Sequence, residues 1–299
     1  MAGNKPPIAA EDAVAFLRST VGEIEHLHYL SEGEESRAFG FRSNGDDLVL
    51  RINASRLGFD MDRMAGQRFG AADLPIPAIR LIVPMGQYYA CISDRALGTT
   101  LQDLAVGGAY DYGRAVCSLL DRLERCDIGW SQGYGPISPD GQGRHRSWSD
   151  FLLSMTTRDW TFLSPACAAR LPQLLGRIED GAKYASEVRR LIHGDFGSNN
   201  VLVADGRVTG LIDWSEAMVG DSLYDLANIF FWRPWLDCME QQCRYVIENE
   251  PHRLDQRDRL VTYAIHIGLG AAHDAAKAGD ETPTEWALDR CHALLEDGL

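Results

Sequence analysis

Residues 190–214 carry the pattern that most restricts the fold of this 299-residue chain. A short strand-like run at 190–192, with Leu191 and Ile192, leads into the polar octet HGDFGSNN at 193–200, and two more strand-like runs follow at 201–203 and 208–212. Asp205-Gly206 separates the last two runs and is a strong hairpin signal. The pattern therefore predicts three short strands that hold one polar loop, with Ile-Asp-Trp at 212–214 ending the hairpin.

The polar positions of this segment have the types and spacing that phosphoryl transfer requires. Asn200 follows Asp195 by five residues, and Asp213 ends the next hairpin. In this chemistry one carboxylate orients and deprotonates the attacking hydroxyl, while an amide oxygen and a second carboxylate hold magnesium on the nucleotide phosphates. Mg²⁺ favours such an incomplete protein shell, which phosphate and water complete.

The remaining sequence divides into a mixed first part and a helical second part. Composition changes near a linker at 93–97, so we expect an N-terminal part at 1–97 and a C-terminal part at 98–299. In the first part, periodicity predicts helices at 11–20 and 60–72 and strands at 25–30, 36–41, 48–52, 79–83 and 87–92. In the second, it predicts helices at 111–126, 147–155, 165–184, 222–248, 256–277 and 284–296, and a long surface loop at 129–146.

The net charge of the chain limits the classes of molecule that it is expected to bind. The chain has 29 Lys and Arg against 43 Asp and Glu, a net charge of −14. This balance argues against nucleic acid and an anionic membrane and suits a small cationic substrate. Seven cysteines without a CxxC pair, no signal-peptide pattern and no long apolar stretch lead us to expect a cytoplasmic protein with reduced thiols, and we expect a monomer.

The octet and the Ile-Asp-Trp strand resemble the catalytic and metal motifs of the aminoglycoside phosphotransferase family. The resemblance extends to LSEGEESRAF at 30–39 and to 212–235, and the run NIFFWRPW at 228–235 is most similar to the branch acting on hygromycin B at its 4-hydroxyl. It implies an α+β, two-lobed protein-kinase-like fold, with a small antiparallel β-rich first lobe and a larger, mainly helical second lobe. It also implies Asp195 as the catalytic residue and Asn200 and Asp213 as magnesium ligands.

The resemblance further implies a site for ATP or GTP in the first part. The turn at 33–39 resembles the phosphate-covering turn, with the Ser36 hydroxyl and backbone amides as phosphate contacts. Arg51 stands where most of the family has lysine, and we expect it to pair with Asp62. Backbone groups of Asp94 and Ala96 are expected to bond the adenine edge, a main-chain contact that does not distinguish ATP from GTP.

Substrate residues are expected after Asp213. Asn199 and Glu216 flank the catalytic and metal residues. Trp232 and Trp235 lie three residues apart, and we expect them on one side of a helix start, where they offer faces to sugar rings. A core role for both tryptophans is the competing interpretation.

Two rival functions remain open at this stage. One is another small-molecule kinase of the same fold, acting on a different antibiotic or on a metabolite such as choline or homoserine. The other is a nucleotide-binding module without activity, which the missing lysine favours and the intact Asp195, Asn200 and Asp213 oppose. A Walker-type ATPase is disfavoured because no GxxxxGK motif is present, and a protein kinase because no A-P-E segment follows Asp213.

Overall fold

The computed structural model describes residues 6–30 and 36–299. Contacts divide the chain into two compact units: unit 1 comprises Met1–Leu97 and Thr209–Ser215, and unit 2 comprises Gly98–Val208 and Glu216–Leu299. The sequence-based division assigned 209–215 to the C-terminal part, whereas here this segment packs with unit 1. The Leu211 N–H, for example, donates to the Pro75 carbonyl at 2.8 Å.

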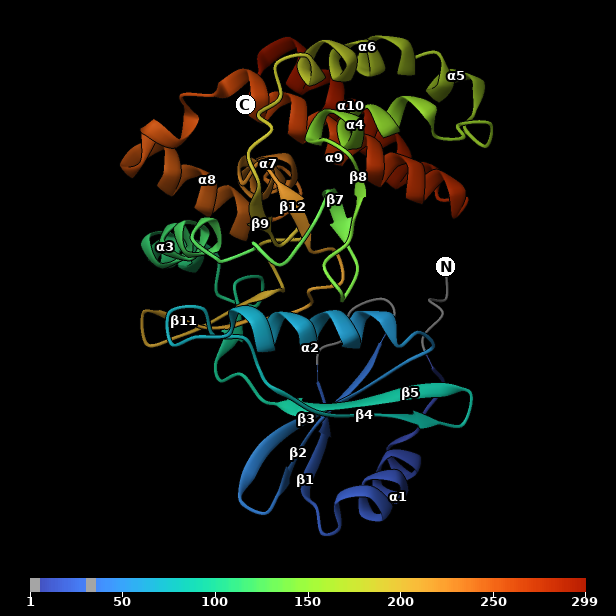
Figure 1. The fold of residues 1–299 in the computed structure, drawn as a ribbon, viewed down its shortest axis with the longest axis vertical. Helices are drawn as coiled ribbons and strands as arrows, with labels where there is room; N and C mark the ends of the chain where they lie inside the picture. Colours follow the sequence, from blue (N-terminus) through green and yellow to red (C-terminus); the bar gives the residue numbers. More distant parts are fainter. Residues whose placement is uncertain (1–5, 31–35) are drawn as a thin grey trace. The chain divides into compact units, whose positions relative to one another are not determined.

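Unit 1 is an antiparallel sheet in the order β1-β2-β3-β5-β4 with one helix on each face (Figure 1). Its elements are α1 (Ala10–Val21), β1 (Glu25–Tyr29), β2 (Arg37–Ser43), β3 (Asp46–Asn53), α2 (Leu57–Phe69), β4 (Ile79–Met85) and β5 (Tyr88–Asp94). Leu48, Leu50 and Ile52 of β3 are buried in the core that α1 covers. Because side chains alternate along a strand, Arg51 projects from the opposite face, on which Phe59 of α2 packs.

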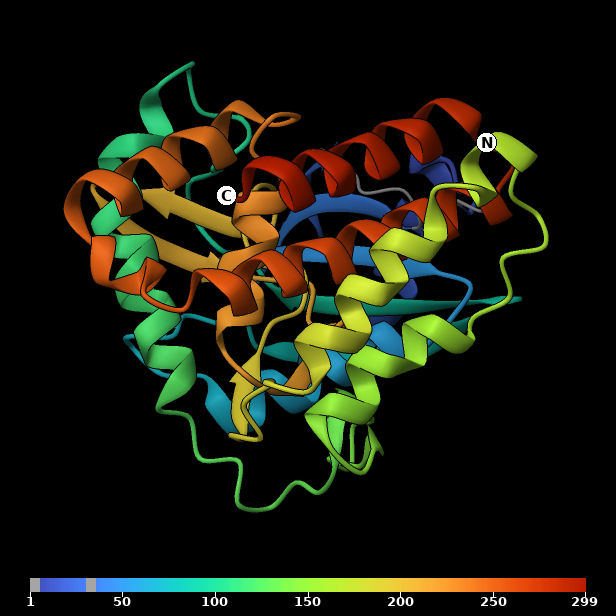
Figure 2. The same ribbon diagram turned by 90° about the horizontal axis from the view of Figure 1, so that it is seen from above.

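Unit 2 is mainly helical, and α9 and α10 lie side by side within it (Figure 2). Its helices are η1 (Gly108–Tyr112), α3 (Gly113–Glu124), α4 (Trp148–Leu153), η2 (Ser154–Thr157), α5 (Pro165–Ala168), α6 (Leu171–Ala182), α7 (Leu223–Trp232), α8 (Asp237–Asn249), η3 (Pro251–Leu254), α9 (Arg257–Lys277) and α10 (Glu281–Asp297). Its strands are β6 (Thr99–Thr100), β7 (Tyr134–Ile137), β8 (Gly143–His145), β9 (Arg190–Ile192), β10 (Val201–Ala204) and β12 (Met218–Gly220). The strand β11 (Arg207–Leu211) carries the chain from unit 2 into unit 1.

The prediction of a surface loop at 129–146 is wrong. This segment forms the hairpin of β7 and β8, and β7 pairs with β12 in a four-stranded sheet ordered β8-β7-β12-β9. Gly135 has a φ of +72°, and a Cβ there would lie 2.9 Å from the His145 ring and 3.0 Å from Phe151. A glycine-rich sequence therefore serves close packing here, rather than a loop.

The prediction of one helix over 222–248 is also wrong. Helix α7 ends at Trp232 and α8 begins at Asp237, with Pro234 between them. Trp232 and Trp235 therefore do not share a helix start, because Trp232 ends one helix and Trp235 lies in the turn before the next. A second proline, Pro172, accompanies the division of 165–184 into α5 and α6.

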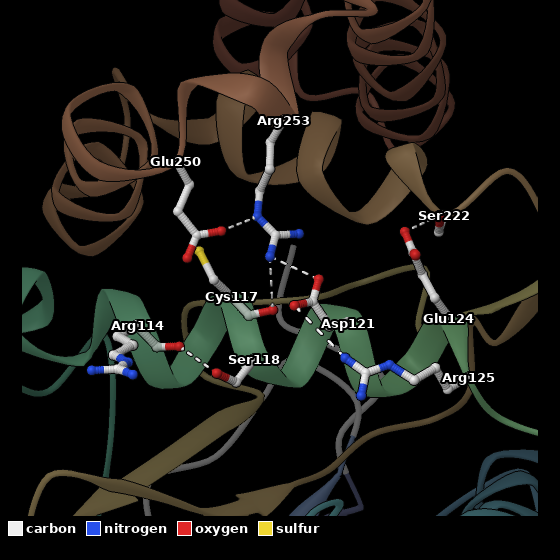
Figure 3. A network of polar contacts seen from close by, with 9 residues as sticks. All are labelled: Arg114, Cys117, Ser118, Asp121, Glu124, Arg125, Ser222, Glu250 and Arg253. Atoms are coloured by element: carbon white, nitrogen blue, oxygen red, sulfur yellow. Dashed lines mark hydrogen bonds and ion pairs between the residues drawn. The ribbon is translucent and has the colours of Figure 1, made fainter.

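Helix α3 is joined to the N-terminus of α7 and to η3 by the polar contacts of Figure 3. The Ser222 hydroxyl, just before α7, donates to Glu124 at 2.6 Å. Arg253 donates to Asp121 at 2.7 Å and also pairs with Glu250. The Ser222–Glu124 bond holds the start of α7, the helix that meets the polar loop described next.

Candidate functional site

The polar loop His193–Asn200 connects β9 to β10 in unit 2, and Asp225 of α7 holds its first two residues. One carboxylate oxygen of Asp225 accepts the His193 N–H at 2.8 Å, and the other accepts the Gly194 N–H at 2.9 Å. Burial raises the pKa of Asp225 to about 6, against the opposing influence of His193 and these N–H groups. Gly194 has a φ of +88°, and a Cβ there would lie 2.1 Å from the Glu216 carbonyl, so glycine alone fits.

Asp195 and Asn200 are brought together in this loop. The exposed Asp195 carboxylate accepts a hydrogen bond from the Asn200 amide nitrogen at 2.8 Å, and the Asp195 carbonyl accepts a second one at 2.9 Å. Asn200 is buried, so it holds its neighbour in one orientation. With its nitrogen engaged, the amide oxygen is the atom that Asn200 offers to a cation.

Asn199 and Glu216 are both exposed. The Asn199 amide oxygen accepts the Ser198 hydroxyl at 2.9 Å. Glu216 is the first residue of unit 2 after the Asp213 segment, and its carbonyl lies against Gly194. Asn199 therefore lies within the polar loop, and Glu216 adjoins the loop at Gly194.

Asp213 belongs to unit 1 and is exposed. Its φ is +61°, in the left-handed region, and its carboxylate accepts the Ser215 hydroxyl at 2.8 Å. The next residue, Trp214, is buried, and its N–H donates to the Asp62 carboxylate of α2 at 2.9 Å. The segment after the Ile-Asp-Trp strand is thus fixed to α2.

Arg51 and Asp62 form the expected ion pair, which joins β3 to α2. The Asp62 side chain is 7% exposed and that of Arg51 is 22% exposed. Burial disfavours the arginine charge, but attraction to Asp62 outweighs it and raises the pKa of Arg51. The Arg51 guanidinium also lies over the Phe59 ring, 5.2 Å from its centroid. One carboxylate, Asp62, therefore holds both Arg51 and the segment that follows Asp213.

The other residues predicted to contact the nucleotide lie in unit 1. The Ser36 hydroxyl, directly before β2, accepts the Asn53 amide at 3.1 Å; residues 33–35 of the predicted phosphate turn lie outside the described residues. Asp94 ends β5, its N–H donates to the Ala78 carbonyl at 2.9 Å, and Ala96 lies two residues further on.

Three tryptophans of unit 2 form a cluster, which we call the tryptophan cluster: Trp232, Trp235 and Trp286. Trp232 stacks on Trp286 of α10 with centroids 5.4 Å apart and planes 10° apart, and Trp235 meets Trp286 edge-on at 4.6 Å. Trp235 is 51% exposed, so a core role does not describe it. The cluster gathers the two predicted tryptophans although they do not share a helix.

Sequence reasoning missed the contacts of three residues. The carboxylate of Asp225 in α7 holds the polar loop. Asn228 of the same helix donates to the Phe196 carbonyl at 3.1 Å. Both are polar residues in the apolar run LYDLANIFFW, and that contrast was the available signal. Trp286 lies 51 residues after Trp235 and carried no local signal.

Comparison with known proteins gives a family match over most of the chain. A model of the phosphotransferase enzyme family matches residues 26–256. Hygromycin-B 4-O-kinase from Escherichia coli is 40% identical over 299 residues, which cover 98% of this chain and 87% of that protein. Homoserine kinase from Gluconobacter oxydans (strain 621H) is 27% identical over 239 residues, which cover 74% of this chain and 70% of that protein.

Solved structures agree with these matches. The crystal structure of aminoglycoside phosphotransferase APH(4)-Ia superposes with a TM-score of 0.92 at 40% identity, covering 97% of this chain and 100% of that chain. A thermostable mutant of APH(4)-Ia, crystallised as a ternary complex with AMP-PNP and hygromycin B, gives 0.90 at 41% identity over 95% and 98% of the two chains. These similarities confirm the α+β, protein-kinase-like fold that the sequence predicted.

Proposed function

The chain belongs to the phosphotransferase enzyme family, and from this premise we propose that it moves the γ-phosphate of a nucleoside triphosphate to the 4-hydroxyl of hygromycin B. Membership confirms the family resemblance of the polar octet and the Ile-Asp-Trp strand. In this proposal unit 1 binds the nucleotide, and unit 2 carries the catalytic aspartate and binds the aminoglycoside.

Asp195 is the proposed catalytic residue. An exposed carboxylate can accept the proton of a sugar hydroxyl as that oxygen attacks phosphorus. The hydrogen bond from Asn200 holds the carboxylate in place. Asp225 adds rigidity because it fixes the two residues that precede Asp195.

The oxygen donors of Asn200 and Asp213 fit magnesium, which favours carboxylate and carbonyl oxygens completed by phosphate and water. Asn200 presents its amide oxygen because its nitrogen is engaged, and the exposed Asp213 keeps one carboxylate oxygen beyond the Ser215 bond. When bound, the ion would neutralise phosphate charge. Its ligands would be these two side chains.

Arg51 is the proposed phosphate-binding cation of unit 1. Asp62 and Phe59 orient its guanidinium, and arginine can bind phosphate through two parallel hydrogen bonds. The Ser36 hydroxyl is proposed as a further phosphate contact, and backbone groups of Asp94 and Ala96 as adenine contacts. Either ATP or GTP satisfies these contacts. Relatives crystallised with AMP-PNP and with ADP support ATP as the first nucleotide to test.

The tryptophan cluster and the acids near the polar loop are the proposed aminoglycoside contacts. The half-exposed Trp235 offers an apolar face to a sugar ring, and Trp232 supports it through Trp286. Glu216 can accept an ammonium group, and Asn199 can bond a hydroxyl. The ternary complex of the 41% identical relative contains hygromycin B, which supports this substrate over other aminoglycosides.

The exposed Asp195 carboxylate, held by the buried Asn200, carries the proposal. Asp195→Asn should lower turnover of hygromycin B with ATP and magnesium by about 10²–10⁴-fold and leave folding unchanged. Asp205→Asn is the matched control, because Asp205 is an exposed acid in the following turn with no proposed role. Near-normal turnover by the Asp195 variant would contradict the assignment.

A substrate panel tests the acceptor. Hygromycin B should be phosphorylated and its product located by NMR at the 4-hydroxyl, whereas kanamycin should react poorly because misaligned hydroxyls lose rate even when they bind. Homoserine belongs in the panel because homoserine kinase is a 27% identical relative. Turnover of homoserine but not hygromycin B would replace the proposal with a metabolite kinase.

We propose that the enzyme works in the cytoplasm as a monomer. All seven cysteines are free and buried, which suits a reducing compartment. Within residues 6–30 and 36–299, no helix combines the length and apolar character that crossing a bilayer requires. Light scattering during gel filtration measures the oligomeric state, and fractionation of expressing cells measures the compartment.

A further inference from the structure

One face of α7 carries three polar or amphipathic side chains that all act toward the site. Asp225, Asn228 and Trp232 stand at positions i, i+3 and i+7, so they lie along one stripe of the helix. Asp225 bonds the loop before Asp195, and Asn228 bonds it just after, at the Phe196 carbonyl. Trp232, at the end of the stripe, belongs to the tryptophan cluster.

Asn228 bridges the loop and the cluster. Its amide nitrogen donates to the Phe196 carbonyl at 3.1 Å, and its amide oxygen accepts the Trp232 indole N–H at 3.2 Å. Carbonyls only accept and indole N–H groups only donate, so the amide has one orientation that satisfies both neighbours. Asn228 is 3% exposed, and the loss of either bond would leave a buried polar group without its partner.

The bridge continues to solvent through aromatic contacts. Trp232 stacks on Trp286, and Trp286 meets the half-exposed Trp235. A continuous series of packed or hydrogen-bonded groups therefore runs from an exposed indole to the carbonyl next to Asp195. Each contact in it lies within unit 2.

We propose that Asn228 is a positioning residue that fixes the backbone at Asp195 relative to the tryptophan cluster. The distance between the indole rings that contact the aminoglycoside and the Asp195 carboxylate that receives its proton is thereby kept constant. This inference rests on the proposed function for the identity of the acceptor. Asn228 contacts no substrate itself, and it acts through Phe196 and Trp232. Its loss should reduce kcat because small misplacements of reacting groups lower rates steeply.

The substitution Asn228→Asp tests the bridge with almost no change of shape. The introduced carboxyl group still accepts the Trp232 N–H, but when ionised it places an oxygen against the Phe196 carbonyl and donates nothing. We expect kcat for hygromycin B to fall about 10- to 100-fold, with less than a threefold change in KM for ATP. Asn249→Asp is the control: Asn249 is an exposed amide of α8 that donates to Tyr110 and Tyr245.

A pH series separates positioning from general damage to the fold. Burial raises the pKa of a carboxyl group, and its protonated form donates to Phe196 while still accepting from Trp232, which restores both bonds. The ratio of wild-type to variant kcat should therefore narrow as pH falls from 8 to about 6. A ratio that stays large at every pH would assign the loss to structural damage and overturn the proposal.

A second pair of variants tests the other half of the bridge. Trp232→Phe removes the indole N–H but keeps an aromatic ring, and it should lower kcat less than Asn228→Asp. The double variant should lose little more than the larger single loss, because both substitutions break one connection. Additive losses, or wild-type kcat in a folded Asn228 variant, would overturn the inference. Absence of hygromycin B turnover in the wild-type enzyme would instead contradict the proposed function.

Discussion

Two buried carboxylates, one in each unit, hold segments that carry the predicted site residues. In unit 1, Asp62 accepts the N–H of Trp214, the neighbour of Asp213. In unit 2, Asp225 accepts the N–H groups of His193 and Gly194, just before Asp195. Both carboxylate oxygens of each acid accept hydrogen bonds. Asp62 fixes the backbone next to Asp213, and Asp225 fixes the backbone next to Asp195.

We call Asp62 the unit 1 anchor and Asp225 the unit 2 anchor. The two carboxylates differ in how their negative charge is compensated. Asp62 pairs with the guanidinium of Arg51, whereas the two Asp225 oxygens accept the backbone N–H groups of His193 and Gly194. Burial raises the pKa of Asp225 to about 6. The comparison indicates that the unit 1 anchor depends on its cation and that the unit 2 anchor depends on pH.

Removal of the unit 1 anchor should have the largest effect. Asp62→Ala leaves the Arg51 charge in a mostly buried position and takes the acceptor from the Trp214 N–H. Loss of one partner of a buried pair costs about 3–5 kcal/mol, and the 22% exposure of Arg51 places this site near the lower end. Urea denaturation measures the change in the free energy of unfolding.

Asp60→Ala provides the control on the same helix. Asp60 pairs with Arg56 at 2.9 Å, but that arginine is 49% exposed, so the loss should stay below about 1 kcal/mol. Similar losses at Asp60 and Asp62 would show that the buried pair contributes no more than a surface pair.

The unit 2 anchor should give opposite pH trends for stability and turnover. The folded pKa of Asp225, about 6, lies above the ordinary aspartate value of 3.8, so the folded state binds this proton more tightly. The stability contributed by protonation is therefore fully present below about pH 4 and is lost as pH rises through about 6, with a total on the order of 2–3 kcal/mol. Turnover should change the other way, because only the ionised carboxylate accepts both loop N–H groups.

The measurement compares wild-type enzyme with Asp225→Asn, which does not titrate at this position. The difference between their unfolding free energies should vary over pH 4–6, and only the wild type should lose kcat as pH falls through about 6 for this reason. Parallel pH profiles of kcat for the two proteins would show that Asp225 does not control the loop through its charge.

The same two regions show what the sequence could predict. The Arg51–Asp62 pair was predictable because both residues belong to a known arrangement of strand and helix. The contact of Asp225 with the loop was not, because hydrogen bonds from His193 and Gly194 join residues 31 and 32 positions apart. Only its placement in an apolar helix hinted that this acid is buried.

Short elements explain the other errors. The strands β7 and β8 have four and three residues, too few to establish an alternating pattern in a glycine-rich segment. Their pairing with β12 is a tertiary contact that no local window contains. The break between α7 and α8 was easier to predict from the sequence, because Pro234 lies at the break and proline interrupts helix interiors. The mixed first part and the helical second part were predictable because long elements show clear periodicity, and the kinase-like fold class followed from the family resemblance of the polar octet.

The smallest expected change in stability is that of replacing arginine by lysine at position 51. Arg51→Lys keeps a positive charge for Asp62 but loses the planar group that lies over Phe59, so it should cost about 1 kcal/mol of stability. Toward the nucleotide it should retain part of the function, whereas Arg51→Ala should raise KM for ATP or lower turnover more strongly.

The substitution Phe59→Leu refines this test, because it removes the ring without touching the ion pair. If stacking explains the preference for arginine, Arg51→Lys should cost less stability in the Phe59→Leu background than in the wild type. An equal cost in both backgrounds would attribute the preference to the geometry of the Asp62 pair alone. Either result separates the contribution of charge to the Arg51–Asp62 pair from the contribution of the shape of the guanidinium.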